Sequence, residues 1–469
     1  MIAAALLTLP LGLFTHPLFT WVENNGYLCD SVAIAEHDGM RGLCATADIA
    51  EGEVILTLPP SLQLGVDSAG PLTGLVDATP PELWIARLGL ALCAEKKRGA
   101  DSPFAPYIDA LPDASELPCL LAPESPGGYG HDATSEAYDA KAALAAWPPT
   151  AERATGIRRA LRKLHMSLEQ IAAATDAETP SLADLGWAAS SAGSRAYRVR
   201  GAVGDSGGDE ARFLPIVDLA NYAPAGTENA RVLNAPRIDT DNGSSPPIKG
   251  ASDDPCAVSL IACKDIPEGM PILCDYNGGS PLSNERLLLE YGFVLKDRHD
   301  DELNLPFGAI AVGLEAAANA YDEDAKSPSD AAEEAFGGVN YHQARLLRQL
   351  GDVESSGLVF LATGKPSPAT FALALILTAR RPAELAEAKA VDELVASCGK
   401  AHAARANTAL GACAKAALEE LDKRRVPSSE GLDGFDAAAD AFCETRRKIL
   451  SRAVETTAAA VKIVAASIV

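Results

Sequence analysis

Hydrophobic residues recur with two different periods along the chain, and the change of period divides it into segments. Short apolar runs rich in β-branched residues and bounded by glycine or proline are typical of β-strands. Runs of this kind lie at residues 31–34, 53–56, 212–219, 257–263 and 271–276. Between the second and third runs, from about residue 70 to 186, apolar residues recur at spacings of three and four, which predicts amphipathic helices. The strands on either side of this helical insert must pair across it, so we expect one non-local β-core.

The chain after residue 310 has only helical patterns. Its long segments are rich in alanine, the residue with the highest intrinsic helix propensity, and carry apolar positions three and four residues apart. The predicted fold class is therefore α+β, with a β-core split by a helical insert at about 70–186 and followed by an all-α C-terminal domain at 311–469.

The first 18 residues form an apolar segment, which begins MIAAALLTLPLGLF. This run is too short to span a bilayer, and no Lys or Arg precedes Arg41, whereas signal and transit peptides carry early positive charge. We expect an N-terminal helix that packs on the body of the protein, with a cleaved leader as the alternative. No other stretch has the length of a membrane span, so we expect no stable membrane insertion and a cytoplasmic protein, with a plastid as the alternative compartment.

The net charge of the chain indicates which kinds of macromolecule it can bind. Forty Lys and Arg face 64 Asp and Glu, a formal net charge of −24. Binding to nucleic acid needs concentrated positive charge, so we expect no nucleic-acid partner, and a basic peptide or protein suits this surface better. The ten cysteines contain no CxxC pair, and Cys256, Cys263 and Cys274 lack zinc-knuckle spacing, so we expect no metal site.

Four stretches concentrate residues that could carry chemistry. A Gly-rich turn, Gly39-Met40-Arg41-Gly42-Leu43, precedes the helical insert, and Ser194-Arg195-Ala196-Tyr197 follows it. Further along, Asp218 and Asn221 interrupt the apolar run FLPIVDLANYAP, and the last stretch reads ILCDYNGGSPLSNERLLLEYGFV. The chain has no HExxH helix and no complete phosphate loop, which excludes two common enzyme classes.

In their order and separation these four stretches resemble the SET-domain methyltransferases. They are most similar to the branch of the Rubisco large-subunit lysine methyltransferase, which also contains an actin-histidine methyltransferase. The resemblance implies a SET domain over residues 19–310 and, more loosely, a helical substrate-binding domain over 311–469. No cysteine follows Tyr291 before Cys398, which agrees with a branch that lacks the zinc-bound closing segment of many histone-directed enzymes.

The implied cofactor is S-adenosylmethionine. Residues Gly39 to Gly42 would let the backbone approach it closely, because glycine has no Cβ. The resemblance implies that the Arg195 guanidinium pairs with the methionine carboxylate, in a contact that suits its forked shape. The residues implied in cofactor binding are Gly39, Met40, Arg41, Gly42, Arg195, Asp218, Asn221 and Tyr222. Relatives usually carry Asn-His where this chain has Asn221-Tyr222, which puts part of the cofactor contacts in doubt.

The resemblance makes Tyr276 the catalytic tyrosine. A phenol with a pKa near ~10 is a poor bulk base, so we expect Tyr276 to orient the nucleophile by hydrogen bonding. Tyr197, Tyr291 and Phe293 would line the channel for the target side chain. The implied reaction is methyl transfer to a lysine of a non-histone protein substrate.

Two alternatives stay open. One is a protein-histidine methyltransferase, against which Tyr197 weighs because lysine-modifying relatives tend to carry an aromatic residue two positions after the arginine. The other is a non-catalytic SET-fold scaffold that docks a partner protein. For each of these functions we expect a monomer. Its C-terminal helices would either dock the substrate or cover apolar surface on the core.

Overall fold

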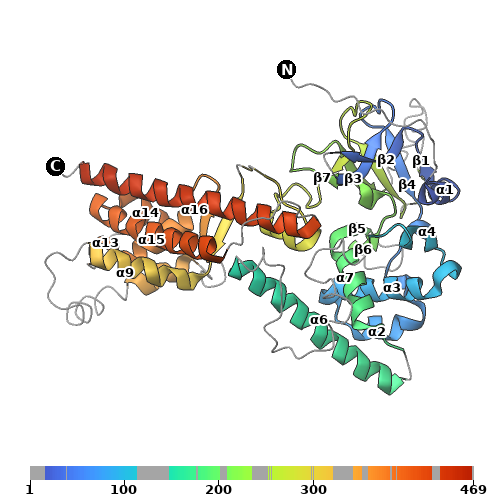
Figure 1. Cartoon of the computed structure of the whole chain (residues 1–469), viewed down its shortest axis with the longest axis horizontal. Coiled ribbons are helices and arrows are strands. Elements are labelled where there is room, and N and C mark those ends of the chain that lie inside the picture. The colour runs from blue at the N-terminus through green and yellow to red at the C-terminus, as the bar shows by residue number, and fades with distance from the viewer. Residues whose placement is uncertain are drawn as a thin grey trace. The chain divides into compact units, whose positions relative to one another are not determined.

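The computed structural model divides the chain into two compact units (Figure 1). The described residues are 16–37, 40–112, 147–175, 178–200, 209–234, 252, 254, 256–296, 298, 300–320, 342–350, 357–380, 383–386, 388–424 and 434–466. The first unit comprises Met1–Thr134, Gly156–Leu282 and Leu289–Tyr291. The second unit comprises Ser135–Thr155, Ser283–Leu288 and Gly292–Val469. Each unit is considered separately below.

The first unit is built on a six-stranded sheet with the strand order β1-β4-β9-β8-β10-β7. The strands are β1 (Tyr27–Leu28), β4 (Val54–Leu58), β7 (Asn221–Tyr222), β8 (Ala230–Asn234), β9 (Val258–Ala262) and β10 (Leu273–Cys274). β4 and β9 pair antiparallel, from Val54 opposite Ile261 to Leu58 opposite Val258. All five residues of each strand are buried, and apart from Thr57 and Ser259, whose hydroxyl groups lie 2.7 Å apart, their side chains are apolar.

Two antiparallel hairpins accompany this sheet. One joins β2 (Val32–His37) to β3 (Met40–Ala45), and the other joins β5 (Ala196–Arg200) to β6 (Asp209–Phe213). In the first hairpin Ala35 lies opposite Gly42. The glycine-containing stretch predicted as a turn is therefore mostly strand.

Helices from between the two groups of strands gather beside the sheet in Figure 1. They are α2 (Thr73–Ala78), α3 (Trp84–Arg98), α4 (Ala105–Ile108) and α7 (Leu182–Arg195). α3 and α7 pack closely at Gly89, where a Cβ atom would lie 3.1 Å from the Ala189 nitrogen. α6 (Pro148–Thr175) contributes its residues from Gly156 onward to this unit.

The described part of the chain begins just before a short helix that packs on the first unit. α1 (Pro17–Glu23) buries Leu18, Phe19 and Val22 in the core of the first unit. Residues 1–15, which hold most of the expected helix, lie outside the described residues. None of the described helices is long and apolar enough to cross a bilayer.

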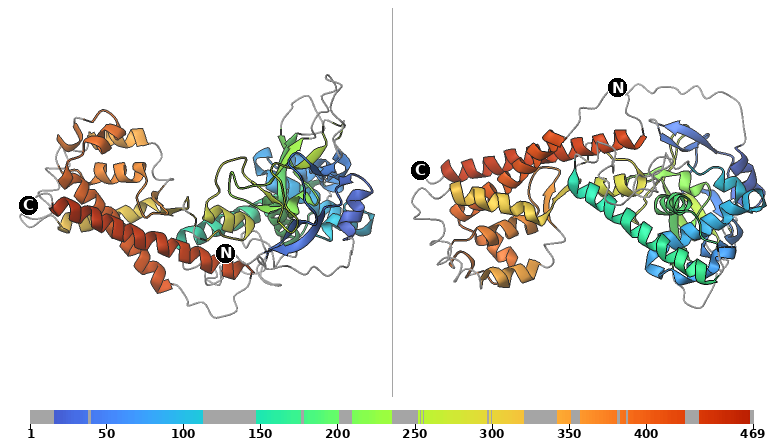
Figure 2. Two further views of the ribbon diagram at one scale, coloured as in Figure 1. Left: turned by 90° about the horizontal axis from the view of Figure 1, so that it is seen from above. Right: turned by 60° about the horizontal axis from the view of Figure 1, so that its bottom comes forward.

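The second unit is mainly helical. Its helices are α8 (Asn284–Arg286), α9 (Ile310–Ala320), α12 (Pro368–Thr378), α13 (Ala383–Ala386), α14 (Val391–Ser397), α15 (Lys400–Arg424) and α16 (Gly434–Ala466). α15 packs against both α9 and α16, and the three lie side by side in Figures 1 and 2. Gly313 permits this approach, because a Cβ atom there would overlap the Ala409 carbonyl group.

One element corrects the expectation of purely helical structure after residue 310. β12 (Leu358–Leu361) pairs antiparallel with β11 (Glu302–Leu305). Leu358 and Phe360 are buried, while Val359 and Leu361 are partly exposed. This alternation in a four-residue β-rich run is too short to stand out among long helical patterns.

Candidate functional site

An ion pair in the first unit brings two of the predicted residues together. Arg195 ends α7, and Asp218 lies in the 3₁₀ turn Val217–Leu219. The Arg195 Nη1 atom donates to the Asp218 carboxylate and to the Asp218 main-chain carbonyl, both at 3.2 Å. The Asp218 side chain is 2% exposed and that of Arg195 is 23% exposed. A charge pair with so little solvent needs further hydrogen bonds to satisfy its remaining polar atoms.

Two of those polar atoms have no protein partner among the residues that the structure describes. They are the Asp218 Oδ1 acceptor and the Arg195 Nε donor, and both are buried. Burial raises the pKa of Asp218 although Arg195 and Tyr107 counteract it. Burial would lower the pKa of Arg195, but the Asp218 charge outweighs this and raises it. The pair therefore offers one acceptor and one donor to a polar ligand.

Backbone strain precedes Asp218. Ile216 has a φ of 70°, and it is the one non-glycine residue with a positive φ in the described ranges. A β-branched residue is a genuine outlier in this region. Its side chain is fully buried, and Asp218 and Leu219 follow in the tight turn. Packing of Ile216 thus stabilises an unfavourable bend that ends the apolar run at Asp218.

The Gly42 and Asn221 pair forms a second part of the site. The Asn221 side-chain nitrogen donates to the Arg41 carbonyl at 3.3 Å. A Cβ atom on Gly42 would overlap that nitrogen and lie 3.2 Å from the Leu219 carbonyl oxygen. A larger residue at position 42 would therefore have to displace the Asn221 side chain. Met40 begins β3, and Gly39 lies outside the described residues, so its expected role stays a prediction.

Parallel pairing of β7 with β10 brings the third and fourth sequence stretches together. Asn221 lies opposite Leu273 and Tyr222 opposite Cys274. Two residues beyond β10, the Tyr276 hydroxyl donates to the Ala220 carbonyl at 2.7 Å. Residues more than fifty positions apart are thus joined by backbone and side-chain hydrogen bonds.

Three tyrosine rings are grouped at this point. The Tyr276 ring centroid lies 5.4 Å from that of Tyr222 and 5.1 Å from that of Tyr291. Tyr291 ends a π-helical turn, Leu287–Tyr291, after which Gly292 adopts a left-handed conformation. The Tyr197 hydroxyl lies 3.5 Å from the Val217 carbonyl. Phe293 belongs to the second unit, so its expected place in the same channel stays a prediction.

Burial keeps the phenol groups of Tyr276 and Tyr197 protonated. It raises the pKa of Tyr276 far above the usual value, with Cys274 adding to the shift and Arg195 opposing it. Burial likewise raises the pKa of Tyr197 well above 10.0. The neighbouring Cys274 thiol has its pKa raised by burial to about 12. Tyr276 and Tyr197 therefore offer neutral hydroxyl groups, and Cys274 is a neutral thiol, at neutral pH.

Sequence reasoning missed one member of the site. The Tyr107 hydroxyl donates to Asp218 Oδ2 at 3.0 Å from α4, within the helical insert. The α4 sequence, Ala-Pro-Tyr-Ile, has no pattern that distinguishes it from an ordinary buried turn. Only the folded structure reveals this contact between residues 111 positions apart.

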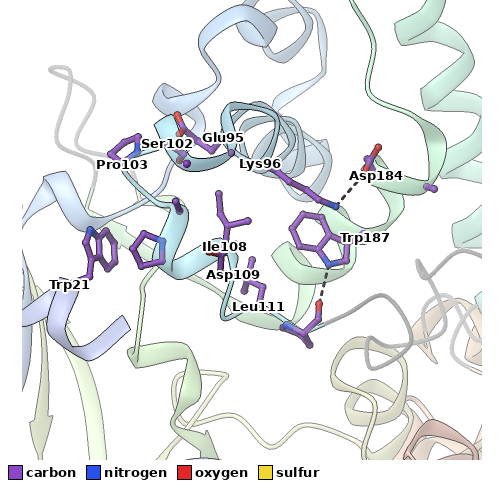
Figure 3. Close-up of a pocket in the computed structure, with 16 residues that line it drawn as sticks. Trp21, Glu95, Lys96, Ser102, Pro103, Ile108, Asp109, Leu111, Asp184 and Trp187 are labelled. Atoms are coloured by element: carbon purple, nitrogen blue, oxygen red, sulfur yellow. Dashed lines mark hydrogen bonds and ion pairs between the residues drawn. The ribbon is translucent and has the colours of Figure 1, made fainter. Parts of the chain in front are cut away.

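A cavity of about 960 Å³ lies elsewhere in the first unit and contains none of the predicted site residues. Figure 3 shows Trp21, Ile108 and Trp187 around it, with Lys96 bonded to Asp184. The Lys96 ammonium also lies 4.0 Å from the centroid of the Trp187 ring. In the part of the chain that the structure describes, no three His, Cys, Asp or Glu side chains could hold a metal ion.

Comparison with known proteins gives a likeness in structure alone. Neither a family model nor a curated protein sequence matches the chain. Among solved structures, the SET domain of LSMT bound to lysine and AdoHcy has a TM-score of 0.60 and 16% identity, covering 94% of this chain and 90% of that one. Rubisco LSMT bound to AdoMet has a TM-score of 0.60 and 18% identity, covering 95% and 92%.

A third structure, Rubisco LSMT bound to sinefungin and monomethyllysine, has a TM-score of 0.59 and 17% identity, covering 94% and 90%. These matches cover nearly the whole chain, and at such low sequence identity they establish the fold alone. The resemblance to this branch, inferred above from four short stretches, is thus confirmed at the level of the fold.

Proposed function

Since the chain has the fold of the Rubisco LSMT structures, we propose that it transfers a methyl group from S-adenosylmethionine to a lysine side chain of a non-histone protein. The observation that carries the proposal is the buried Arg195–Asp218 pair, which lies in the same unit as the Tyr276 cluster and leaves polar atoms for a ligand. Related structures bind AdoMet, AdoHcy and lysine, which supports this choice of cofactor and target.

The cofactor would be held by residues from three stretches. Arg195 suits a carboxylate, because its guanidinium is permanently charged and has a donor to spare at Nε. Asn221, fixed against the Arg41 carbonyl, keeps its side-chain oxygen for an amino group. The other cofactor contacts are assigned to the backbone of residues 39–42, to Asp218 and to Tyr222. S-adenosylmethionine supplies an electrophilic methyl group on a sulfonium.

The chain's own residues would orient the nucleophile. The lysine ammonium, with a free pKa near ~10.4, must first lose a proton to water, and burial beside a positive charge favours that loss. With the cofactor bound, the lone pair of the lysine nitrogen would form the N–C bond to the methyl group, and the electrons of the broken S–C bond would remain on the sulfur of the thioether product. Tyr276, held by the Ala220 carbonyl, would accept a hydrogen bond from the attacking amine and fix its direction.

Tyr197, Tyr291 and Phe293 are assigned to the channel that the target side chain enters. The grouping of the Tyr276 and Tyr291 rings at 5.1 Å supports this role for Tyr291. Such aromatic walls exclude water from the amine, which favours its neutral form.

The domain assignment belongs to the same proposal. We assign residues 19–310 to a SET domain with a β-core split by the helical insert, and residues 311–469 to substrate docking. The helices α9, α12, α15 and α16 support a docking surface, because they supply area that an active-site channel lacks.

A non-catalytic scaffold is the second candidate, and Tyr222 is the residue that favours it. The family resemblance places histidine at this position, whereas this chain has a tyrosine, whose ring centroid lies 5.4 Å from that of Tyr276. A scaffold would keep the fold and lose cofactor binding.

Calorimetric titration with S-adenosylhomocysteine distinguishes the two functions. We expect the wild-type protein to bind, and Arg195→Ala to weaken binding about ten- to a hundredfold through loss of a charge-assisted contact. Arg424→Ala is the matched control, because Arg424 is an exposed arginine paired with Glu420 on α15. Absence of binding by the folded wild-type protein would refute the enzyme and favour the scaffold.

A further inference from the structure

Tyr107 is a fully buried tyrosine that the reaction described above does not use. Its side chain is 1% exposed, and its ring centroid lies 6.0 Å from that of Phe213. The neighbouring Ile108 and Asp109 instead line the cavity shown in Figure 3. Within this short turn, Tyr107 is the residue that reaches the Arg195–Asp218 pair.

Packing alone does not account for the hydroxyl group of Tyr107. The surrounding core is apolar, and a phenylalanine ring would fill the same space. Burial of a hydroxyl is unfavourable unless it forms a hydrogen bond. Its bond goes to Asp218 Oδ2 at 3.0 Å, and the same oxygen accepts from Arg195 Nη1 at 3.2 Å.

Two donors on one carboxylate oxygen fix the orientation of the carboxylate. Oδ2 is occupied by Tyr107 and Arg195, while Oδ1 has no protein partner in the described part of the chain. Arg195 is anchored in turn through Nη1, which leaves its Nε free of protein partners there. The Tyr107 hydroxyl thus determines which polar atoms of the Arg195–Asp218 pair remain for a ligand.

We propose that Tyr107 is a positioning residue of the cofactor site, which acts by holding the Asp218 carboxylate in the orientation that aims Arg195. The inference rests on the proposed function and adds to it a residue from the helical insert. Tyr107 touches neither cofactor nor substrate, so its effect is expected in cofactor affinity and in the KM for the cofactor. The kcat at saturating cofactor should stay close to that of the wild type.

The inference has a consequence for pH dependence. The ionisable groups that act on Asp218 are Arg195 from α7, Tyr107 from α4, Tyr197 from β5 and Tyr276 beyond β10. Burial raises the pKa of Asp218, while Arg195 and Tyr107 favour the ionised form. Loss of the Tyr107 hydroxyl should therefore raise this pKa further. Protonation of Asp218 releases Arg195, so affinity should fall on acidification, and it should begin to fall at a higher pH in the variant.

The test is calorimetric titration of the full chain with S-adenosylhomocysteine between pH 5 and pH 8. For Tyr107→Phe we expect affinity about tenfold weaker at pH 7, as loss of a hydrogen bond to a charged group implies, and a decline on acidification that begins at a higher pH than in the wild type. Tyr27→Phe is the matched control, since Tyr27 lies in β1 of the same unit. Circular dichroism verifies that each variant is folded.

A second measurement separates positioning from a general structural role. In an Asp218→Ala background, Tyr107→Phe should change the affinity by less than about twofold, because no side-chain oxygen remains to accept its hydrogen bond. An equal effect in both backgrounds, or an unchanged affinity, would overturn the inference. If the wild-type protein does not bind at all, the proposed function itself is wrong, and the inference fails with it.

Discussion

At the scale of single residues, the Tyr276 hydroxyl has its hydrogen already committed to the Ala220 carbonyl. Its oxygen lone pairs remain as acceptors for a donor such as an amine. The pKa of Tyr276 is raised by burial and further by Cys274, so the hydroxyl stays protonated throughout the working pH range. These two facts favour an orienting role and disfavour a general base.

We expect Tyr276→Phe to keep cofactor affinity and to lower kcat about a hundredfold, as removal of one oriented hydrogen-bonding group does in other enzymes. The pH midpoint of the residual activity should equal that of the wild type, because it belongs to the target amine. Steady-state kinetics against pH checks both statements. Turnover near that of the wild type would remove Tyr276 from the mechanism.

Gly42 allows a second test at this scale. A methyl group there overlaps the Asn221 side chain, so we expect Gly42→Ala to displace Asn221 and weaken cofactor binding roughly five- to thirtyfold. Gly74→Ala is the control, because a Cβ atom at Gly74 meets no neighbouring atom within 4 Å. Similar calorimetric affinities for the two variants would contradict the close approach at Gly42.

At the scale of elements, the sequence predicted the strands better than the bends between them. The runs at 53–56 and 257–263 correspond to β4 and β9, because both strands are buried and, apart from Thr57 and Ser259, apolar. The run at 212–219 was expected as one strand, but β6 ends at Phe213 and a turn follows. Isoleucine disfavours a positive φ, and only burial of Ile216 in the folded core overrides that preference.

Some residues of the candidate site were likewise predicted from the sequence, and others were not. Arg195, Asp218 and Tyr276 were predicted as site residues through the family resemblance of the short stretches around them, and the structure places all three in one unit. Tyr107 was not, because its partner is distant in the chain and no periodicity marks it. Local pattern predicts an element and its face, whereas contacts across an insert arise only from packing.

A buried ion pair formed by α16 in the second unit contributes to stability. Arg446 is 2% exposed, pairs with the buried Asp301 carboxylate and donates to the Glu302 carbonyl. Arg446→Leu leaves that carboxylate buried without its cation, so we expect a loss of about 3–5 kcal/mol in unfolding free energy. Urea denaturation followed by circular dichroism measures it.

The adjacent Arg447 is the matched control for this variant. Its pair with Asp422 is about half exposed on both sides. Arg447→Ala should change the unfolding free energy by at most about 1 kcal/mol. If Arg446→Leu changes it by no more than Arg447→Ala does, the buried pair makes no special contribution to stability.

At the scale of the whole molecule, the net charge of −24 favours a basic protein substrate over nucleic acid. The first unit contains the predicted cofactor-binding residues from Met40 onward and the tyrosine cluster, while the second unit supplies a mainly helical surface. This arrangement agrees with the proposed enzyme, in which the first unit would modify a single side chain and the second unit would recognise a folded protein. The central claim is therefore methyl transfer to a lysine.

Incubation with isotopically labelled S-adenosylmethionine and a cell extract, followed by mass spectrometry of the labelled peptides, tests that claim most directly. The wild-type protein should place the label on the side-chain nitrogen of a lysine, Tyr276→Phe should place about a hundredfold less there, and Arg447→Ala should match the wild type. Label on a histidine ring, or no label with a folded protein that binds the cofactor, would contradict the account.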